Sequence, residues 1–399
     1  MKCKLTNKLI NPFMSFGRMP LANGFIKKED FNLEYFFNME VGFSDDLSLF
    51  QLNDHPKPEK MFNKKYPFYT GSSEFMKLHF KDFAKWLKKE YLKSNSKLIE
   101  IGSNDGTLLS NFNNSNIDCV GFEPSENVAL EAKKNNINTL INFFNAENAN
   151  LIKNYINSTD VICASNVICH IPDLTNLIKV IDKMLSNKGC FIFEEPYLGS
   201  MFKKTSYDQI YDEHIYMFSI HSVQKIFKLF DFELIDAIPQ TTHGGSMRYV
   251  VGRKNQHIVN NRVIKGLGDE KKQNLDNIDS CLKFKNSCEK SKENIKNKLI
   301  KLKENGKKIC GYAATSKSTT VLNYCNINTN IIDFICDTTQ EKIGKYSPGT
   351  HIPIVPISHF HKNLPDFAYL FAWNHKKEIF EKEKNFTKNG GEWVSHVSI

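Results

Sequence analysis

The sequence predicts an α/β protein in three parts: a small irregular N-terminal module, a central α/β domain and a smaller C-terminal α/β domain. Its 399 residues are enough for two or three domains that each bury a core. Short apolar runs alternate with helical stretches twice along the chain, and a lysine-rich helical segment separates the two series. Such alternation predicts parallel sheets covered by helices. We expect the three parts to span 1–72, 73–254 and 255–399.

The composition excludes several classes of protein. With 41% hydrophobic and 24% charged residues, the chain is neither disordered nor collagen-like. No stretch approaches the roughly 20 apolar residues that cross a bilayer, and the first residues lack the apolar core of a signal peptide, so we expect a cytoplasmic protein without a membrane partner. The ten cysteines lack paired spacing and predict reduced core residues.

The net charge of +9 is compatible with a nucleic-acid partner or with an anionic small substrate. The lysines concentrate between about 253 and 308, where they alternate with acidic residues. This mixture favours a solvated helical face, and we expect no nucleic-acid partner.

The elements of the first two parts follow in chain order. Residues 1 to about 70 are rich in Phe, Pro and Asn and show no long helical period, which predicts a small irregular module. From Ser73, aromatic and apolar residues recur at helical spacing up to Tyr91, so a long amphipathic helix opens the central domain. Apolar strand-like runs follow at 97–101, 118–122, 161–164 and 190–194, with a helix from Pro172 between the last two. Strands near 232–234 and 248–251 would complete a Rossmann-like sheet.

The third part repeats the alternation on a smaller scale. The helical segment from about 255 to 308 precedes apolar runs at 308–312, 332–336 and 367–371. These runs predict a second, smaller parallel sheet.

The strongest local signal is the turn after the first strand of the central domain. Glu100 ends that strand, and Gly102 and Gly106 stand four residues apart in the turn, which indicates a close approach of backbone to a ligand. About twenty residues later the second strand ends in Glu123 and Pro124. A carboxylate there can accept hydrogen bonds from two ribose hydroxyls, so these elements together predict a nucleoside site.

The spacing of this turn separates two cofactors. The pattern is E-x-G-x-x-x-G and not G-x-G-x-x-G, and the turn contains no Lys or Arg that could meet a pyrophosphate. S-adenosylmethionine carries adenosine without phosphate and therefore fits better than NAD. We expect the donor to be bound by Glu100, Gly102, Asn104, Gly106, Glu123 and Pro124.

A second cluster is dense in titratable groups. It is the run 207–214, in which Tyr211, Asp212, Glu213 and His214 are consecutive, with His170 upstream and His243 downstream. The cluster follows a strand that ends in Glu194, Glu195, Pro196 and Tyr197. Because ligands of open α/β sheets bind at the carboxyl edge of the strands, the cluster predicts an active site.

These motifs resemble the sugar C-methyltransferases of deoxysugar biosynthesis across nearly the whole chain. The resemblance rests on FGRMPLAN at 16–23, EIGSNDG at 100–106, EEPYLG at 194–199, YDEH at 211–214, THGGSMR at 242–248, LNYC at 322–325, PGTHIPI at 348–354 and AWN at 372–374. Members of that family transfer a methyl group from S-adenosylmethionine to C-3 of a nucleotide-linked 4-keto-deoxysugar.

The resemblance implies roles for named residues. His214 would be the base, and Tyr211, Glu213, His170 and either Tyr66 or Tyr69 would surround the sugar. The residues expected to bind the substrate are Glu195, Tyr197, His243, Lys317 and Asn374, although a solvated Lys317 is an equal alternative. Two alternative functions stay open: O- or N-methyl transfer to a sugar, and binding of a sugar nucleotide without catalysis. The sequence leaves the oligomeric state undetermined.

One departure from the family concerns a metal. The family's N-terminal module holds structural zinc through two pairs of cysteines, but this chain keeps Cys3 alone there. Its expected partner falls within residues 5–7, and the second pair falls within residues 41–47, where no cysteine stands. Since four ligands cannot be assembled, we predict no zinc in the module.

Overall fold

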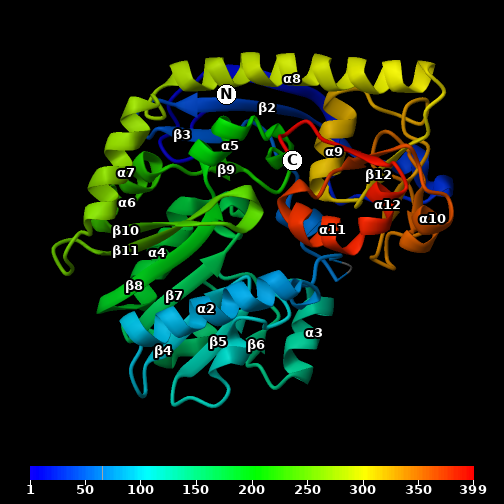
Figure 1. Cartoon of the computed structure of the whole chain (residues 1–399). Coiled ribbons are helices and arrows are strands. Elements are labelled where there is room, and N and C mark those ends of the chain that lie inside the picture. The colour runs from blue at the N-terminus through cyan, green and yellow to red at the C-terminus, as the bar shows by residue number, and fades with distance from the viewer. Residues whose placement is uncertain (65) are drawn as a thin grey trace.

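The computed structural model describes residues 1–64 and 66–399 and arranges them around three sheets (Figure 1). The predicted α/β fold class is confirmed. The boundaries at residues 72 and 254 stay predictions. The helices are α1 (Pro58–Met61), α2 (Glu74–Glu90), α3 (Glu126–Lys134), α4 (Leu174–Met184), α5 (Leu198–Lys204), α6 (Ile220–Lys228), α7 (Asn261–Lys272), α8 (Ile278–Glu304), α9 (Ser316–Tyr324), α10 (Ile357–Lys362), α11 (Lys376–Lys382) and α12 (Lys384–Lys388).

The N-terminal sheet includes a strand from the central part of the chain. Its order is β1 (Pro12–Pro20), β2 (Phe36–Ser44), β3 (Leu49–Leu52) and β9 (Tyr216–Met217), and neighbouring strands are antiparallel. Because β9 begins two residues after His214, this pairing holds the predicted catalytic run against the N-terminal module.

The central sheet has seven strands. Their order is β10 (Phe232–Gln240), β11 (Ser246–Arg253), β8 (Leu185–Pro196), β7 (Thr159–Ser165), β4 (Lys97–Ile101), β5 (Asp118–Phe122) and β6 (Thr139–Leu140). The five strands from β8 to β6 are parallel, whereas β10 and β11 join antiparallel at one edge. Parallel strands therefore direct the carboxyl ends of β4, β5, β7 and β8 toward one edge.

Strand alternation explains how both faces of this sheet are covered. Ile99 and Ile101 pack into the core that contains Ile178 of α4 and Val223 of α6. Leu98 belongs to a different core, which contains Phe83 of α2. Since successive side chains of a strand point to opposite faces, the helices of these two cores cover opposite faces of the sheet.

The C-terminal sheet is wholly parallel. Its order is β14 (Ile354–Pro356), β13 (Ile335–Asp337), β12 (Ile309–Tyr312), β15 (Phe367–Leu370) and β16 (Glu392–Val394). The long helix α8 runs along the N-terminal sheet toward this domain (Figure 1). Phe284 of α8, Phe13 of β1 and Val321 of α9 lie in one apolar core, so the module and the C-terminal domain are packed together.

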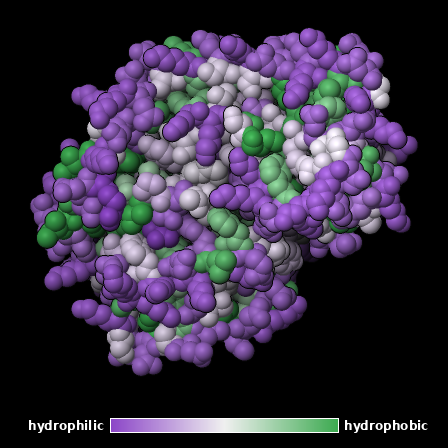
Figure 2. Space-filling model, in the orientation of Figure 1, coloured by the Kyte–Doolittle hydropathy of each residue, from purple (hydrophilic) through white to green (hydrophobic). Residues whose placement is uncertain are grey.

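The face in Figure 2 is mostly hydrophilic, with small scattered apolar patches. Within residues 1–64 and 66–399, no helix has the length and apolar character needed to cross a bilayer. All ten cysteines are free thiols, and nine of them are buried.

Candidate active site

The turn after β4 carries the predicted donor-binding glycines. Gly102 and Gly106 have φ of +68° and +77°, a region that favours glycine. A Cβ on Gly102 would overlap Val167, and one on Gly106 would lie 2.9 Å from Ile137 Cγ1. Both glycines are thus required by their backbone conformation and by packing within the protein.

Glu123 and Glu100 form a pair of buried carboxyl groups under this turn. The Asn104 amide donates to Glu123 Oε2 at 3.0 Å, and the Ser125 amide donates to Oε1 at 2.7 Å. Glu100 Oε2 has no hydrogen-bond partner in the described part of the chain. Burial, together with the nearby Asp105 charge, raises the pKa of both groups. Each Glu123 oxygen keeps a second lone pair, so this site retains acceptors for ribose hydroxyls.

Residues 66–70 of the N-terminal module, here called the strap, are hydrogen-bonded to the turn after β4 and to α3. Asn104 Oδ1 accepts from the Thr70 amide at 2.9 Å, and Asn104 Nδ2 donates to the Phe68 carbonyl at 3.1 Å. Asn127 Nδ2 donates to the carbonyl of Tyr66 at 2.8 Å and to the hydroxyl of Tyr69 at 2.9 Å. The side chain of Asn104, predicted to bind the donor, thus holds the strap.

The two candidate tyrosines of the strap, Tyr66 and Tyr69, have different surroundings. The Tyr69 hydroxyl is bound to Asn127. Burial, followed by the charges of Glu213 and Glu123, raises the pKa of Tyr66 well above its ordinary value. The Tyr66 ring lies 5.6 Å from that of Phe62, which stacks on His170, so Tyr66 is on the side of the predicted catalytic run.

His214 is held in one neutral tautomer. Its Nδ1 lies 2.6 Å from the Gln209 carbonyl, and its Nε2 lies 2.7 Å from the Tyr211 hydroxyl. Since a carbonyl can only accept, Nδ1 carries the proton and Nε2 accepts from Tyr211. Burial, helped by the nearby His170, lowers the pKa of His214 well below its ordinary value. The lone pair on Nε2 is therefore available at neutral pH.

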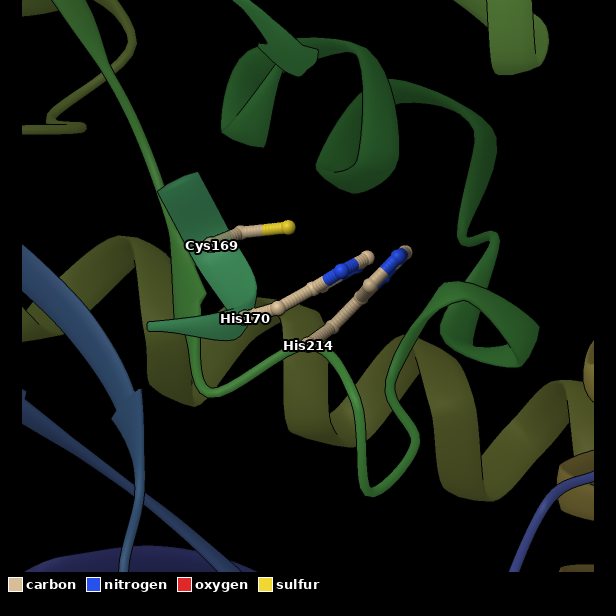
Figure 3. A group of neighbouring side chains, drawn as sticks. All are labelled: Cys169, His170 and His214. Atoms are coloured by element: carbon tan, nitrogen blue, oxygen red, sulfur yellow. The ribbon is translucent and has the colours of Figure 1, made fainter. Parts of the chain in front are cut away.

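His170 stacks on His214. Their ring centroids are 5.3 Å apart with an interplanar angle of 16°, and Phe62 stacks on the other side of His170 at 5.4 Å. Figure 3 shows the two imidazoles side by side, with the Cys169 sulfur beside them. Burial lowers the pKa of His170 to about 3. Within the described residues, its Nε2 is buried without a hydrogen-bond partner.

Carboxylates beside His214 tie the site to the N-terminal module. Asn23 Nδ2 donates to Glu213 Oε1 at 2.8 Å, and the Ala22 amide donates to Asp212 Oδ1 at 3.0 Å. Burial raises the pKa of both Asp212 and Glu213. Ser316, the first residue of α9, donates to Asn23 Oδ1 at 3.0 Å, so Asn23 joins Glu213 to the C-terminal domain.

Glu195 and Tyr197, both predicted to bind the substrate, have protein partners. Glu195 Oε1 accepts the amides of Val167, Ile168 and Cys169 at 3.0, 2.7 and 3.3 Å. This carboxylate thereby positions the loop that carries His170, and burial raises its pKa to about 7. The Tyr197 hydroxyl donates to Glu270 at 2.8 Å, and its role toward the substrate stays a prediction.

The C-terminal domain contributes the remaining predicted residues. Lys317 Nζ donates to Asn374 Oδ1 at 3.1 Å and lies 5.1 Å from the centroid of the Trp373 ring. Lys317 is only 8% exposed, so the alternative of a solvated lysine is wrong. His243 is half-buried, and its pKa is lowered to about 3, mainly by burial and then by Lys317. The charge of Lys317 also helps to lower the pKa of His214, so Lys317, His243 and His214 belong to one region.

Two residues of this region gave no signal of their own in the sequence. Asp208 Oδ2 accepts from Trp373 Nε1 at 2.6 Å, and Asp208 Oδ1 lies 3.1 Å from His396 Nε2. Asp208 precedes Gln209, whose carbonyl orients His214. Its place in the dense run 207–214 could have marked it, whereas nothing near His396 in the sequence did.

Three family models match consecutive parts of the chain. A zinc binding domain matches residues 3–62, a methyltransferase domain matches 74–237, and the C-methyltransferase C-terminal domain matches 241–398. The chain is an S-adenosylmethionine-dependent C-methyltransferase. This C-methyltransferase is 27% identical over 384 residues to the C-methyltransferase NovU of Streptomyces niveus, covering 96% of this chain and 91% of the relative.

Two solved structures are similar to part of the C-methyltransferase. Magnesium protoporphyrin IX methyltransferase of Synechocystis is 14% identical, with a TM-score of 0.36 over 45% of this chain and 83% of that chain. The YcgJ protein of Bacillus subtilis is 12% identical, with a TM-score of 0.36 over 45% of this chain and 100% of that chain.

The matched zinc binding domain lacks the residues for a zinc site in this enzyme. Cys3 is the only cysteine within residues 3–62. It is buried in one apolar core with Leu47 and Leu49, close to where the family's second ligand pair would stand. These residues do not fit a structural zinc, and the absence of zinc stays a prediction.

Proposed function

We propose that this enzyme methylates C-3 of a nucleotide-linked 4-keto-deoxysugar, with His214 Nε2 as the base. The observation that carries the proposal is the neutral tautomer of His214, whose Nε2 lone pair is held 2.7 Å from the Tyr211 hydroxyl. A buried neutral imidazole is a suitable proton acceptor at neutral pH.

Carbon methylation requires such a base. In the proposed reaction His214 Nε2 takes the proton from C-3, and the electron pair of the broken C–H bond moves onto the 4-keto oxygen. The resulting enolate carbon is the nucleophile. When bound, S-adenosylmethionine supplies the methyl group from its sulfonium, and the bonding pair stays on sulfur.

Two neighbours of His214 suit the developing oxyanion. His170 stacks on His214 and has a buried Nε2 without a partner in the described residues. Tyr66 lies near Glu213 with its pKa raised well above the ordinary value by burial first, so it keeps its hydroxyl proton. A hydrogen-bond donor to an oxyanion typically contributes about 3 kcal/mol to transition-state stability.

Lys317 supports a nucleotide-linked substrate. It is a buried cation at the start of α9, with one side-chain acceptor, Asn374. Burial lowers its pKa, so an incoming anion would stabilise its charged form. A diphosphate that links a sugar to a nucleoside has this charge.

A panel of nucleotide-linked 4-keto-sugars, incubated with the donor and analysed by mass spectrometry and NMR, tests the proposal. A product with a new C-3 methyl group is expected. A methyl group on oxygen or nitrogen would identify an O- or N-methyltransferase and overturn carbon transfer. Exchange of the C-3 proton for deuterium without the donor would separately report enolate formation. No consumption of the donor with any sugar would favour a binding protein.

A further inference from the structure

Three ligand-type atoms meet at the His170–His214 stack. Cys169 Sγ and one ring nitrogen from each of His170 and His214 lie within 4.8 Å of one another. In Figure 3 the Cys169 sulfur lies beside the two imidazoles. A tetrahedral zinc with bonds of about 2.0 to 2.3 Å holds its ligand atoms roughly 3.3 to 3.8 Å apart. Side-chain movements of about 1 Å would therefore bring the three atoms to bonding distance of one ion.

The hydrogen bonds of the two histidines suit metal ligation. Histidine ligands usually donate their other ring N–H to a carbonyl or carboxylate, which fixes the ring. His214 already makes this bond from Nδ1 to the Gln209 carbonyl at 2.6 Å. His170 Nε2 is buried without a partner in the described chain, and a buried polar atom of this kind is costly unless a ligand satisfies it.

Buried carboxyl groups stand beside the three ligand-type atoms. Glu195 accepts the Cys169 amide at 3.3 Å, and Glu213 directly precedes His214 in the chain. A sulfur and two imidazole nitrogens bind zinc and other borderline-soft divalent ions in preference to magnesium or calcium.

We propose that Cys169, His170 and His214 form a site for Zn²⁺ or a similar borderline-soft divalent cation, and that its occupation blocks methyl transfer. Binding displaces the Tyr211 hydroxyl from His214 Nε2, releases the Cys169 thiol proton to solvent and forms one metal–sulfur and two metal–nitrogen bonds. The fourth position stays open for water or another ligand. The blocking step rests on the proposed function, because it requires His214 Nε2 to be the base, whereas binding does not.

Cobalt is the probe for binding, because a Co²⁺–thiolate bond gives a charge-transfer band and a tetrahedral Co²⁺ gives visible bands. Full-length protein is treated with chelator, dialysed and titrated with Co²⁺, and Zn²⁺ is then added as a competitor. One equivalent of Co²⁺ with a thiolate band is expected. Cys169→Ser should abolish that band and weaken Zn²⁺ binding by at least about 10-fold.

Two control variants locate the ion. Cys163→Ser changes a buried cysteine of β7, and Cys3→Ser removes the remaining cysteine of the N-terminal module. Neither should alter the band. His170→Asn is the second test variant, and donor binding by calorimetry verifies that each variant is folded. A band that persists in Cys169→Ser, or that disappears in Cys3→Ser, would overturn the site.

Turnover separates the two parts of the proposal. One equivalent of Zn²⁺ should stop methylation, chelator should restore it, and the inhibitory concentration should rise at least about 10-fold in Cys169→Ser. Full Co²⁺ occupancy with unchanged turnover would overturn the blocking step and leave the metal site intact. If no sugar is methylated at all, the proposed function fails while the cobalt titration still decides the site.

Discussion

The Tyr211 hydroxyl lies 2.7 Å from His214 Nε2, while the opposite ring nitrogen of His214 lies 2.6 Å from the Gln209 carbonyl. The second contact fixes which nitrogen carries the proton, and the first contact marks the unprotonated nitrogen, whose lone pair accepts from Tyr211. A base orientated before the substrate arrives needs little reorganisation at the moment of proton transfer.

Replacing His214 should separate binding from catalysis. We expect His214→Asn to bind both ligands nearly normally but to lose about 100-fold or more in turnover, the usual contribution of a general base. The same variant should stop deuterium exchange at the carbon beside the ketone, measured by NMR in D₂O without turnover.

Tyr211→Phe is the matched control for this variant. It keeps the ring that packs on His214 at 4.0 Å and removes only the hydroxyl. It should therefore retain exchange at a reduced rate. Normal exchange in His214→Asn with failed methylation would exclude His214 as the base and make His170 the next candidate.

Glu123 should determine donor affinity. Glu123→Gln keeps the volume of the buried side chain but replaces one acceptor oxygen with a donor group. We expect S-adenosylmethionine binding to weaken by about 1.5 to 3 kcal/mol, measured by calorimetry. Glu126→Ala, at an exposed position at the start of α3, is the control. Equal affinity in the wild type and Glu123→Gln would refute the assignment.

Local patterns in the sequence predict the sheet and part of the site. Leu98, Ile99 and Ile101 alternate between two cores as strand periodicity requires. Tyr211 and His214 are three positions apart, so their pairing also lies within reach of a sequence pattern.

Contacts between distant segments could not be predicted in this way. Asn23 bonds to Glu213 across 190 positions and to Ser316 across 293 positions, and neither bond has a local period. The strand β9, which completes the N-terminal sheet after His214, is two residues long and too short to produce a pattern. These contacts depend on how the three parts pack together.

Lys317 should affect the sugar nucleotide and leave the donor unaffected. We expect Lys317→Met to raise the KM for the sugar nucleotide by about 10-fold or more, since a hydrogen bond to a charged group contributes about 1.5 to 3 kcal/mol. Donor affinity should not change. Lys303→Met is the control, because Lys303 lies at the end of α8 and pairs with Asp333. An unchanged KM in Lys317→Met would remove this lysine from the substrate site.

The N-terminal module should fold without metal. Cys3 is its single remaining cysteine, and it is packed in an apolar core. Elemental analysis of protein purified without added metal and passed over a chelator should find far less than one zinc per chain. One zinc per chain that disappears in Cys3→Ser would contradict this prediction, whereas zinc that depends on Cys169 belongs to the histidine site.

Asp208 should make stability depend on pH in the acid range. Its carboxylate accepts from Trp373 and pairs with His396, and both side chains of that pair are fully buried. Burial alone would raise the pKa of Asp208, but His396, Lys317 and the Trp373 N–H together hold it below its ordinary value of 3.8. A group with a lower pKa in the folded state than in the unfolded state stabilises the fold above the unfolded value and loses this effect as the pH falls.

Asp208→Asn tests this dependence. At neutral pH the variant should lose about 1.5 to 3 kcal/mol of unfolding free energy, the usual contribution of hydrogen bonds to a charged group. The difference from wild type, measured by urea unfolding, should stay constant from about pH 7 to pH 5 and shrink below about pH 4. Asp54→Asn, at an exposed position, should show little difference at any pH. A wild-type advantage that persists undiminished as the pH falls well below 3.8 would show that the charge of Asp208 is not what stabilises this part of the fold.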